Sequence, residues 1–129
     1  MRMLLMSHGQ MAQAALGSAE LIMGKLDNVK AIGLNPDQGP EDLQKEAEEF
    51  LDQGTDKETV VAVDVLGGTP SNVVIRLFAE YPDIQVISGV NLPLIIEFAN
   101  QSMMGQGLNK PQLIAMAKDG IVDVNAKLK

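Results

Sequence analysis

One short run of residues restricts the fold more than any other feature: Val60, Val61, Ala62 and Val63 follow one another without a polar side chain between them. A strand with one solvent-exposed face alternates apolar and polar residues, whereas a strand that is apolar throughout is buried on both faces. Burial on both faces is typical of the interior of a parallel sheet that helices cover from either side. We therefore expect residues 59–64 to form a central strand of an α/β fold.

The rest of the chain alternates short apolar runs with segments of helical periodicity, a pattern that predicts successive strand–helix units. The expected strands are residues 2–6, 29–34, 84–88 and 121–124, and the expected helices are residues 10–23, 40–51, 69–81, 92–99 and 111–118. We therefore expect residues 1–129 to form a single domain, a three-layer α/β fold around one open, mostly parallel sheet.

The composition restricts the class of protein further. The chain has 129 residues, of which 46% are apolar and 21% charged, as in a globular domain. No uncharged apolar stretch approaches the roughly 18 residues of a membrane span. Because the chain contains no cysteine and one histidine, neither a disulfide nor a zinc site is expected. We predict a cytoplasmic protein that uses no metal and no cofactor.

The charge bears on the kind of partner. The net charge is −7, and the aromatic residues number three phenylalanines and one tyrosine. Nucleic-acid-binding surfaces need clustered cations and commonly use aromatic side chains, so nucleic acid is not an expected partner. The negative charge suits either a solvated surface or steering towards a basic protein.

One predicted helix, which Asn91 can cap, is apolar on nearly every side. Its apolar residues are Leu92, Leu94, Ile95, Ile96, Phe98 and Ala99. A helix of this kind must be buried on nearly all sides, and a chain of this size offers few such places. We therefore infer self-association, with this helix at a subunit interface.

Two polar residues stand where strands of the predicted sheet end. His8, the only histidine, lies just past the strand over residues 2–6, and Asp64 ends the strand over residues 59–64. In open parallel sheets, ligands bind beyond the carboxyl ends of the strands, at the point where the strand order reverses. We therefore expect His8 and Asp64 to reach one crevice from different loops.

The chemistry of His8 and Asp64 fits phosphoryl transfer. A neutral imidazole has one bare nitrogen that can attack phosphorus and one N–H whose direction must be fixed. A carboxylate that accepts this N–H selects the tautomer and stabilises the cationic phosphoimidazole. Alone, a histidine is more often a surface residue and a strand-end aspartate a turn or cap residue. Their predicted meeting at one crevice favours the catalytic interpretation.

The segment after Asp64 supplies a candidate anion site. Gly67 and Gly68 let the backbone approach an anion closely, and the helix that follows directs free N–H groups at it. Thr69 adds a hydroxyl, either as a helix cap or as a phosphate donor. An ordinary turn between a strand and a helix explains these residues equally well, so the segment gains its meaning from the neighbouring His8.

Three separated motifs then resemble one known family. They are Ser7-His8-Gly9, residues 63–70 with the sequence VDVLGGTP, and residues 86–93 with the sequence VISGVNLP. Together they resemble the IIA component of the mannose-type (mannose, fructose, sorbose) sugar phosphotransferase system, in order and spacing over essentially the whole chain. The related phosphocarrier domain of dihydroxyacetone kinase systems lacks the Gly-Gly-Thr-Pro loop and is the less similar alternative.

The resemblance implies a phosphotransferase. His8 would accept a phosphoryl group from the histidine phosphocarrier protein and pass it to a IIB component, which phosphorylates sugar during uptake. The IIB component is expected to be a separate polypeptide because this sequence ends at Lys129. The protein would be cytoplasmic, held near the membrane through its sugar permease, and the sequence does not indicate which sugar is transported.

The resemblance also implies roles for individual residues. Asp64 matches the aspartate that orients the histidine, and Thr69 stands where members carry serine or threonine near the phosphate. We count Gly9, Gly67 and Gly68 as the other phosphate-binding residues.

Family members are homodimers that exchange a C-terminal antiparallel strand, a role that the predicted strand over residues 121–124 would fill here. Two other functions remain open from the sequence. One is a regulatory module whose partner binding changes when His8 is phosphorylated, and the other is a metabolite-binding domain with a dispensable His8.

Overall fold

Strands and helices alternate along the chain as far as Met104 in the computed structural model, which describes residues 1–129, and two further helices follow. In chain order the elements are β1 (Arg2–His8), α1 (Met11–Met23), β2 (Val29–Leu34), α2 (Pro40–Asp52), β3 (Thr59–Val63), α3 (Thr69–Leu77), β4 (Gln85–Ser88), α4 (Leu92–Met104), α5 (Lys110–Asp119) and α6 (Val124–Lys127). The predicted order of the first nine elements is confirmed. Three bounds differ by two residues or more: β1 continues past Met6 to His8, α3 ends at Leu77 rather than near residue 81, and α4 continues past Ala99 to Met104. The remaining bounds of these elements agree to within one residue.

The sheet consists of four parallel strands in the order β2-β1-β3-β4. All five residues of β3 are buried between its two neighbours, which confirms the central strand predicted from the run Val60 to Val63. The chain passes from β1 to β2 on one side and then returns to β3 on the other side of β1. The strand order therefore reverses between β1 and β3, and their carboxyl ends border the crevice where open parallel sheets bind ligands.

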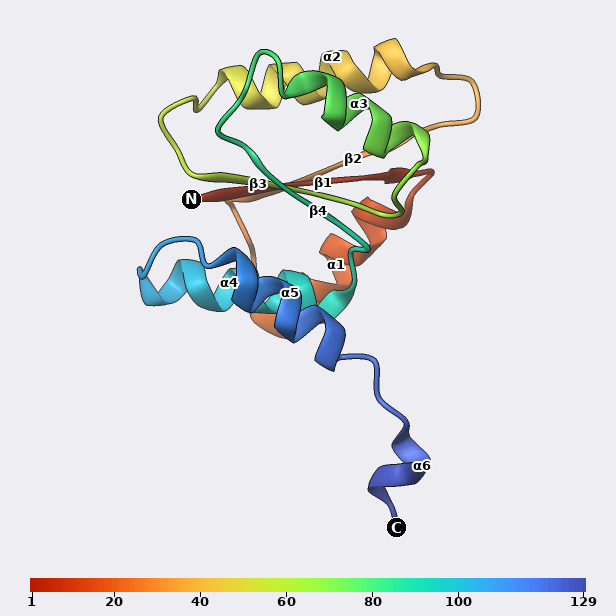
Figure 1. Cartoon of the computed structure of the whole chain (residues 1–129), viewed down its shortest axis with the longest axis vertical. Coiled ribbons are helices and arrows are strands. Elements are labelled where there is room, and N and C mark those ends of the chain that lie inside the picture. The colour runs from red at the N-terminus through yellow and green to blue at the C-terminus, as the bar shows by residue number, and fades with distance from the viewer.

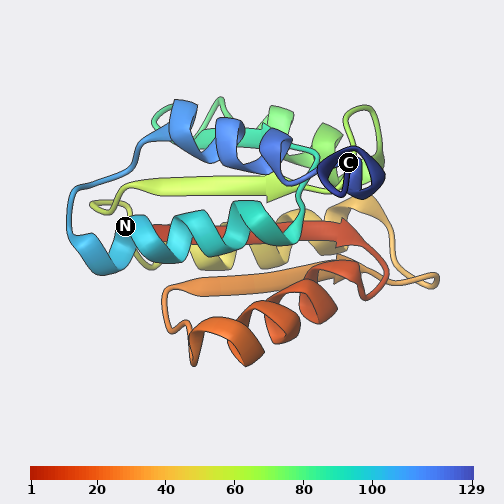
Figure 2. The ribbon, with the colours of Figure 1, turned by 90° about the horizontal axis from the view of Figure 1, so that it is seen from below.

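Helices cover both faces of the sheet, with α2 and α3 on one face and α1, α4 and α5 on the other (Figure 1). Alternate residues of β1 supply the two apolar cores: Met3 and Leu5 pack towards α1, α4 and α5, whereas Leu4 and Met6 pack towards α2 and α3. Figure 2 shows α1, α4 and α5 covering this face of the sheet, with their axes roughly along the strands. The three-layer α/β architecture is confirmed, and none of its helices is long and apolar enough to cross a membrane.

The apolar helix α4 is buried by its own chain. Leu94, Ile95, Phe98 and Ala99 are at most 1% exposed, and α4 packs on the sheet and against α1 and α5. Asn91 caps it as predicted, because its side chain accepts a hydrogen bond from a backbone N–H of the first turn at 3.0 Å. The burial of these four residues therefore requires no second chain, and the placement of this helix at a subunit interface stays a prediction.

The predicted strand over residues 121–124 is absent. Its last residue begins the short helix α6, which Asp123 caps by accepting the N–H of Ala126 at 3.2 Å. A strand needs a neighbouring backbone to exchange hydrogen bonds with, and this segment extends away from the rest of the chain (Figure 1). Ile121 and Val122 are 83% and 44% exposed, so the apolar pattern that suggested a strand is present but has no partner.

Candidate active site

The two predicted catalytic residues lie side by side at the carboxyl ends of the central strands. His8 is the last residue of β1, and Asp64 directly follows β3. The strands pair in parallel with Met6 opposite Val63, and the N–H of Asp64 donates to the carbonyl of Met6 at 3.2 Å. The sheet register therefore brings the two side chains together at one edge of the sheet, as the sequence predicted.

Asp64 fixes the imidazole of His8 through one short hydrogen bond. His8 Nδ1 lies 2.7 Å from Asp64 Oδ2, and the backbone N–H of His8 donates to the same oxygen at 2.9 Å. The other oxygen, Oδ1, accepts the N–H of Val65 at 2.9 Å. Because an ionised carboxylate only accepts hydrogen bonds, Nδ1 carries the proton and Nε2 is left as the bare nitrogen.

The surroundings of Asp64 keep it ionised. Burial of the carboxylate opposes its charge, but the hydrogen bonds from His8 and from the N–H of Val65 hold the pKa of Asp64 below its ordinary value, and the imidazole adds attraction when it is protonated. The side chain of Asp64 is 9% exposed, whereas that of His8 is 50% exposed. The orienting group is therefore shielded while the nucleophile faces solvent, where another protein can reach it.

Gly68 lies against the free edge of the imidazole. A Cβ at this position would stand 2.6 Å from Cε1 of His8 and 3.2 Å from Nε2, closer than side chains pack. Gly68 has φ −85°, which any residue can adopt, so the requirement for glycine comes from the ring and not from the backbone. At Gly67 the requirement for glycine comes from the backbone, because its φ of +90° is a left-handed conformation that favours glycine.

The start of α3 supplies free hydrogen-bond donors next to Nε2. The backbone N–H groups of Gly67, Gly68, Thr69 and Ser71 donate to no acceptor within the chain, and Pro70 has no N–H. The first turn of α3 contains no acidic residue that would compete for these donors. Free N–H groups and the positive end of a helix dipole favour an anion such as a phosphoryl group.

Gly9, the remaining predicted phosphate-binding residue, has no free donor. Its N–H donates to the carbonyl of Leu34 at 2.8 Å, and its φ of +55° lets the chain turn from β1 towards α1. Gly9 therefore shapes the loop behind His8.

Sequence reasoning gave no role to several residues around His8. Ser7 is fully buried, and its Oγ accepts the N–H of Ala12 at 2.8 Å, which secures the first turn of α1. A serine shortly before a helical pattern is a capping signal and could have identified the role of Ser7.

The apolar side chains of Met11, Val65 and Leu66 are 49%, 52% and 73% exposed. The sequence gives no sign of this exposure, which only the structure shows. No group of three or more histidine or carboxylate side chains is arranged to hold a metal ion.

Comparison with known proteins identifies the family of the chain. Residues 2–111 match the family model described as PTS system fructose IIA component. This chain belongs to the mannose-type IIA family of the sugar phosphotransferase system (PTS). The resemblance drawn from the three sequence motifs is confirmed, and with it a role in phosphoryl transfer during sugar uptake.

Relatives of this IIA protein carry different sugar names. The sorbose-specific EIIA component of Klebsiella pneumoniae is 37% identical over 94 residues, which span 73% of this chain and 69% of that protein. The mannose-specific EIIAB component of Escherichia coli K12 is 33% identical over 92 residues, which span 70% of this chain and 28% of that larger protein. These names assign no sugar to this chain.

Solved structures extend the likeness to the whole fold. The PTS IIA protein associated with the fucose utilization operon of Streptococcus pneumoniae matches with a TM-score of 0.88 at 27% identity, over 99% of this chain and 96% of that one. The PTS component EIIA of Streptococcus agalactiae matches with a TM-score of 0.84 at 31% identity, over 97% and 98%. The arrangement of strands and helices is therefore shared with PTS IIA proteins nearly from end to end.

Proposed function

We propose that His8 is a phosphoryl carrier that accepts its group from the histidine phosphocarrier protein and passes it to a IIB component. The observation that supports this most directly is the 2.7 Å contact between His8 Nδ1 and Asp64 Oδ2. It leaves Nε2 as the attacking nitrogen, beside the unbonded N–H groups at the start of α3. Family membership favours the same role, and it favours a cytoplasmic site of action near the sugar permease.

The transfer is a balanced exchange between two imidazoles. The lone pair of Nε2 forms the new N–P bond while the N–P bond of the donor breaks and its electron pair returns to the donor ring. The proton on Nδ1 stays in its bond to Asp64, so this chain needs no separate acid or base. The second transfer runs the same steps towards the IIB component.

Catalysis by this chain then consists of positioning and electrostatics. The carboxylate holds the ring in one orientation, and the cationic phosphoimidazole is stabilised by its charge. The N–H groups of Gly67, Gly68 and Thr69 have no acceptor within the chain, and we expect them to stabilise the equatorial oxygens of the phosphoryl group. The hydroxyl of Thr69 adds one further donor.

The adduct itself tests the proposal. The protein is incubated with the phosphocarrier protein and its phosphoryl donor, and its intact mass is measured together with the ³¹P NMR shift of the adduct. We expect one phosphoryl group on Nε2 in the wild type and in the exposed-site control Gln13→Ala, and none in His8→Ala. An adduct that persists in His8→Ala, or one located on Nδ1, would contradict the assignment.

A regulatory module would carry the same modification, so the onward step separates the two functions. When a purified IIB component is added to the phosphorylated protein, we expect the phosphoryl group to leave His8 and to appear on IIB. Retention on His8 in the presence of an active IIB component would favour regulation over transfer.

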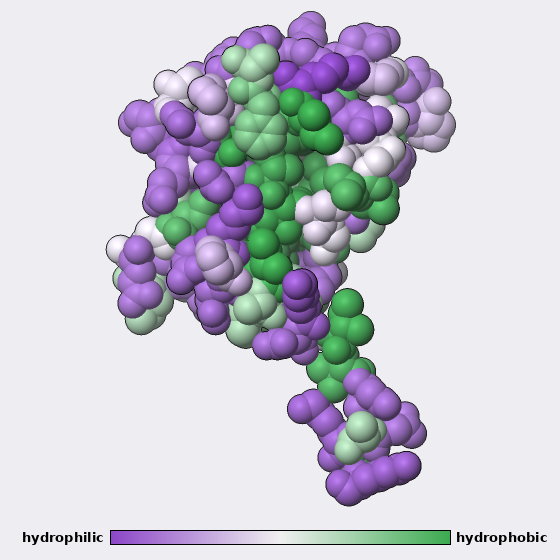
Figure 3. Space-filling model, viewed as in Figure 1, coloured by the Kyte–Doolittle hydropathy of each residue, from purple (hydrophilic) through white to green (hydrophobic).

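We also infer that the chain forms a homodimer through the open edge of β4. The outer side of β4 has no neighbouring strand, and a hollow of about 230 Å³ beside it is lined by Ile87, Ile114 and Ile121. Apolar surface runs down this face of the molecule and reappears on the projecting C-terminal segment (Figure 3). An exchanged segment over residues 121–124 would cover that surface.

The oligomeric state tests the homodimer. The substitution Val122→Asp puts a charge on the projecting segment, and we expect it to convert a dimer into a monomer in light scattering. The matched change Asn125→Asp, in the exposed helix α6, should leave the dimer intact. A wild-type monomer would contradict the inference without affecting the role of His8.

A further inference from the structure

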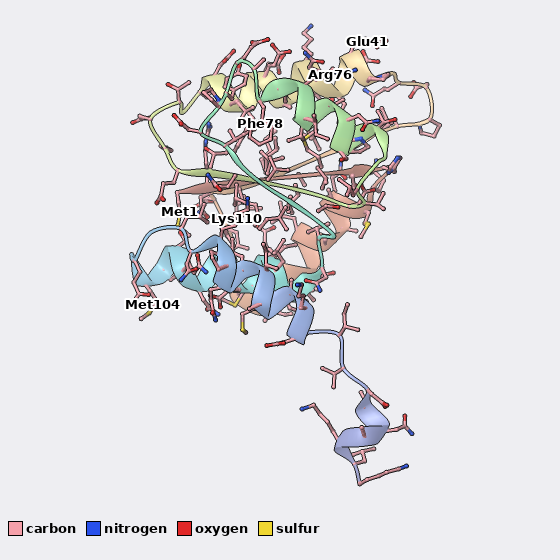
Figure 4. All side chains as sticks on the ribbon, viewed as in Figure 1. Met1, Glu41, Arg76, Phe78, Met104 and Lys110 are labelled. Atoms are coloured by element: carbon pink, nitrogen blue, oxygen red, sulfur yellow. The ribbon has the colours of Figure 1, made fainter.

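The amino ends of the strands, at the opposite end of the sheet from His8, form a second hollow. It has a volume of about 500 Å³ and borders the starts of β1 and β2 and the end of α2. Met1 marks this end of the sheet in Figure 4. Volumes of this size are typical of sites for small molecules.

Cations concentrate around this hollow. Arg2, Lys30 and Lys57 line it, which are three of the ten lysine and arginine residues of a chain whose net charge is −7. The only carboxylate in its lining is that of Asp27. This local excess of positive charge is opposite in sign to that of the whole chain, and it would attract an anion.

Arg2 is buried without an anionic partner. It is 8% exposed, and no carboxylate forms an ion pair with it. Its Nε donates to Thr59 Oγ1 at 2.8 Å, and its two Nη atoms donate to the carbonyls of Phe50 and Leu51 at 2.6 and 3.0 Å. A guanidinium has five N–H donors, so two remain after these three bonds, all of which go to neutral acceptors.

No carboxylate therefore compensates the charge of Arg2 by direct contact. Burial lowers the pKa of the guanidinium, and Asp56 opposes this only from a distance beyond ion-pair contact. On its other side Arg2 borders a smaller hollow of about 190 Å³, where Glu80 and Asp83 would repel an anion. Arg2 also lines the larger hollow, where Lys30 and Lys57 add positive charge and Asp27 is the only carboxylate.

We propose that this hollow binds a small phosphate monoester, with its phosphoryl oxygens held by Arg2, Lys30 and Lys57. Forked donors on a guanidinium match phosphate oxygens, and two flexible ammonium groups suit a dianion better than a single carboxylate. The ring of Phe50, whose centroid lies 4.4 Å from Arg2 Cζ, also lines the hollow and offers apolar contact to the carbon part of the ligand. The site is separate from His8 and does not depend on the phosphoryl-transfer proposal.

Titration of the ¹⁵N-labelled full chain with phenyl phosphate, at constant ionic strength, tests the site. We expect saturable shifts of the amides of Arg2, Lys30 and Lys57. The double variant Lys30→Gln/Lys57→Gln, which leaves Arg2 in place, should weaken binding by about tenfold. Lys45→Gln on the exposed side of α2 removes the same kind of charge and should bind as the wild type does.

Several outcomes would overturn the site. They are shifts that never saturate, equal affinity in the double variant, or saturable shifts confined to the start of α3. Phosphatidic acid vesicles present the same phosphate monoester on a lipid surface, and binding to these vesicles alone would replace a soluble ligand by a membrane one. The variant His8→Ala should bind phenyl phosphate unchanged, so failure here is distinguishable from failure of the carrier role.

Discussion

The two ends of the central strand β1 handle charge in opposite ways. At its carboxyl end, His8 is half exposed and its one charged partner is the carboxylate of Asp64. At its amino end, Arg2 is buried and its partners are neutral oxygens. Arg2 is 8% exposed, yet no carboxylate forms an ion pair with its guanidinium group.

We expect the His8 end to transfer a phosphoryl group and the Arg2 end to bind an anion. Around His8 the stabilising groups are backbone dipoles and a negative orienting group, with no lysine or arginine paired to Asp64. Such an environment can support a phosphoryl group during transfer without binding it as tightly as fixed cations would. Around Arg2 the charge is permanent, and its three hydrogen bonds to neutral oxygens stabilise the fold. We expect this fixed positive charge to favour retention of an anion. We therefore expect substitutions at the two ends to affect different measurements.

Asp64→Asn should give the largest effect on transfer. The variant keeps an oxygen acceptor but loses the charge that fixes the imidazole and stabilises its phosphorylated form, so we expect transfer to slow about 10³-fold. Quench-flow measurement of phosphoryl transfer to the IIB component checks this. Asp83→Asn makes the same change at the opposite end of the sheet and should leave the rate unchanged. An unaltered rate in Asp64→Asn would remove Asp64 from the mechanism.

The same variant should also change the acid limb of the stability profile. Because the folded pKa of Asp64 lies below its unfolded value of about 3.9, its contribution to stability is complete above that pH. The contribution is lost as the pH falls through the lower, folded pKa. We therefore expect Asp64→Asn to lose less stability than the wild type when urea unfolding is followed from pH 5 downwards.

Gly68→Ala should slow transfer by about 10²-fold. The new Cβ would overlap the imidazole edge near Cε1, so the ring must tilt away from the bond to Asp64, and small misplacements of reacting groups are costly. Gly67→Ala is the contrasting variant, since its Cβ would meet nothing within 4 Å but its backbone is left-handed. We expect it to lower stability more and the transfer rate less. Equal effects of the two variants on the rate would show that loop conformation, and not ring contact, matters.

The sequence was sufficient to bring His8 and Asp64 together because that inference needs few facts. Apolar runs locate the strands, parallel strands end at one edge, and the order reverses beside β1. The free donors at the start of α3 follow from the same reasoning, since the first turn of any helix has unpaired N–H groups. The carboxyl end of the sheet is therefore readable from local pattern and topology.

The environment of Arg2 at the amino end of the sheet could not be predicted in this way. Arg2 begins a strand, where a charged residue would ordinarily be expected at the surface, and its partners Phe50 and Leu51 lie 48 and 49 residues away. Contact between Gly68 and the imidazole likewise depends on side-chain placement that spacing does not give. Within the single chain, the segment over residues 121–124 does not form the predicted strand. Its apolar pattern is present, but a strand also requires a partner backbone.

Arg2→Met should reduce stability and leave transfer intact. Methionine retains most of the apolar stem but leaves the carbonyls of Phe50 and Leu51 without their donor, so we expect a loss of about 2 kcal/mol in urea unfolding. Arg76→Met removes the only other arginine, which is exposed on α3, and should cost less than about 0.5 kcal/mol. A slower transfer rate in folded Arg2→Met would contradict the claim that the two ends of β1 affect different measurements.

Thr69→Ala should have the smallest effect of the series. Its hydroxyl is one donor beside several backbone N–H groups that the substitution leaves in place, so we expect transfer to slow by about two- to fivefold. Thr69→Ser keeps the hydroxyl and should restore the wild-type rate in the same quench-flow assay. If Thr69→Ala were as slow as Gly68→Ala while Thr69→Ser remained fast, the hydroxyl would outweigh the backbone donors. Binding of the phosphoryl group at the His8 end of β1 would then depend on a side chain. The two ends of β1 would differ less, because neither would rely on backbone N–H groups alone.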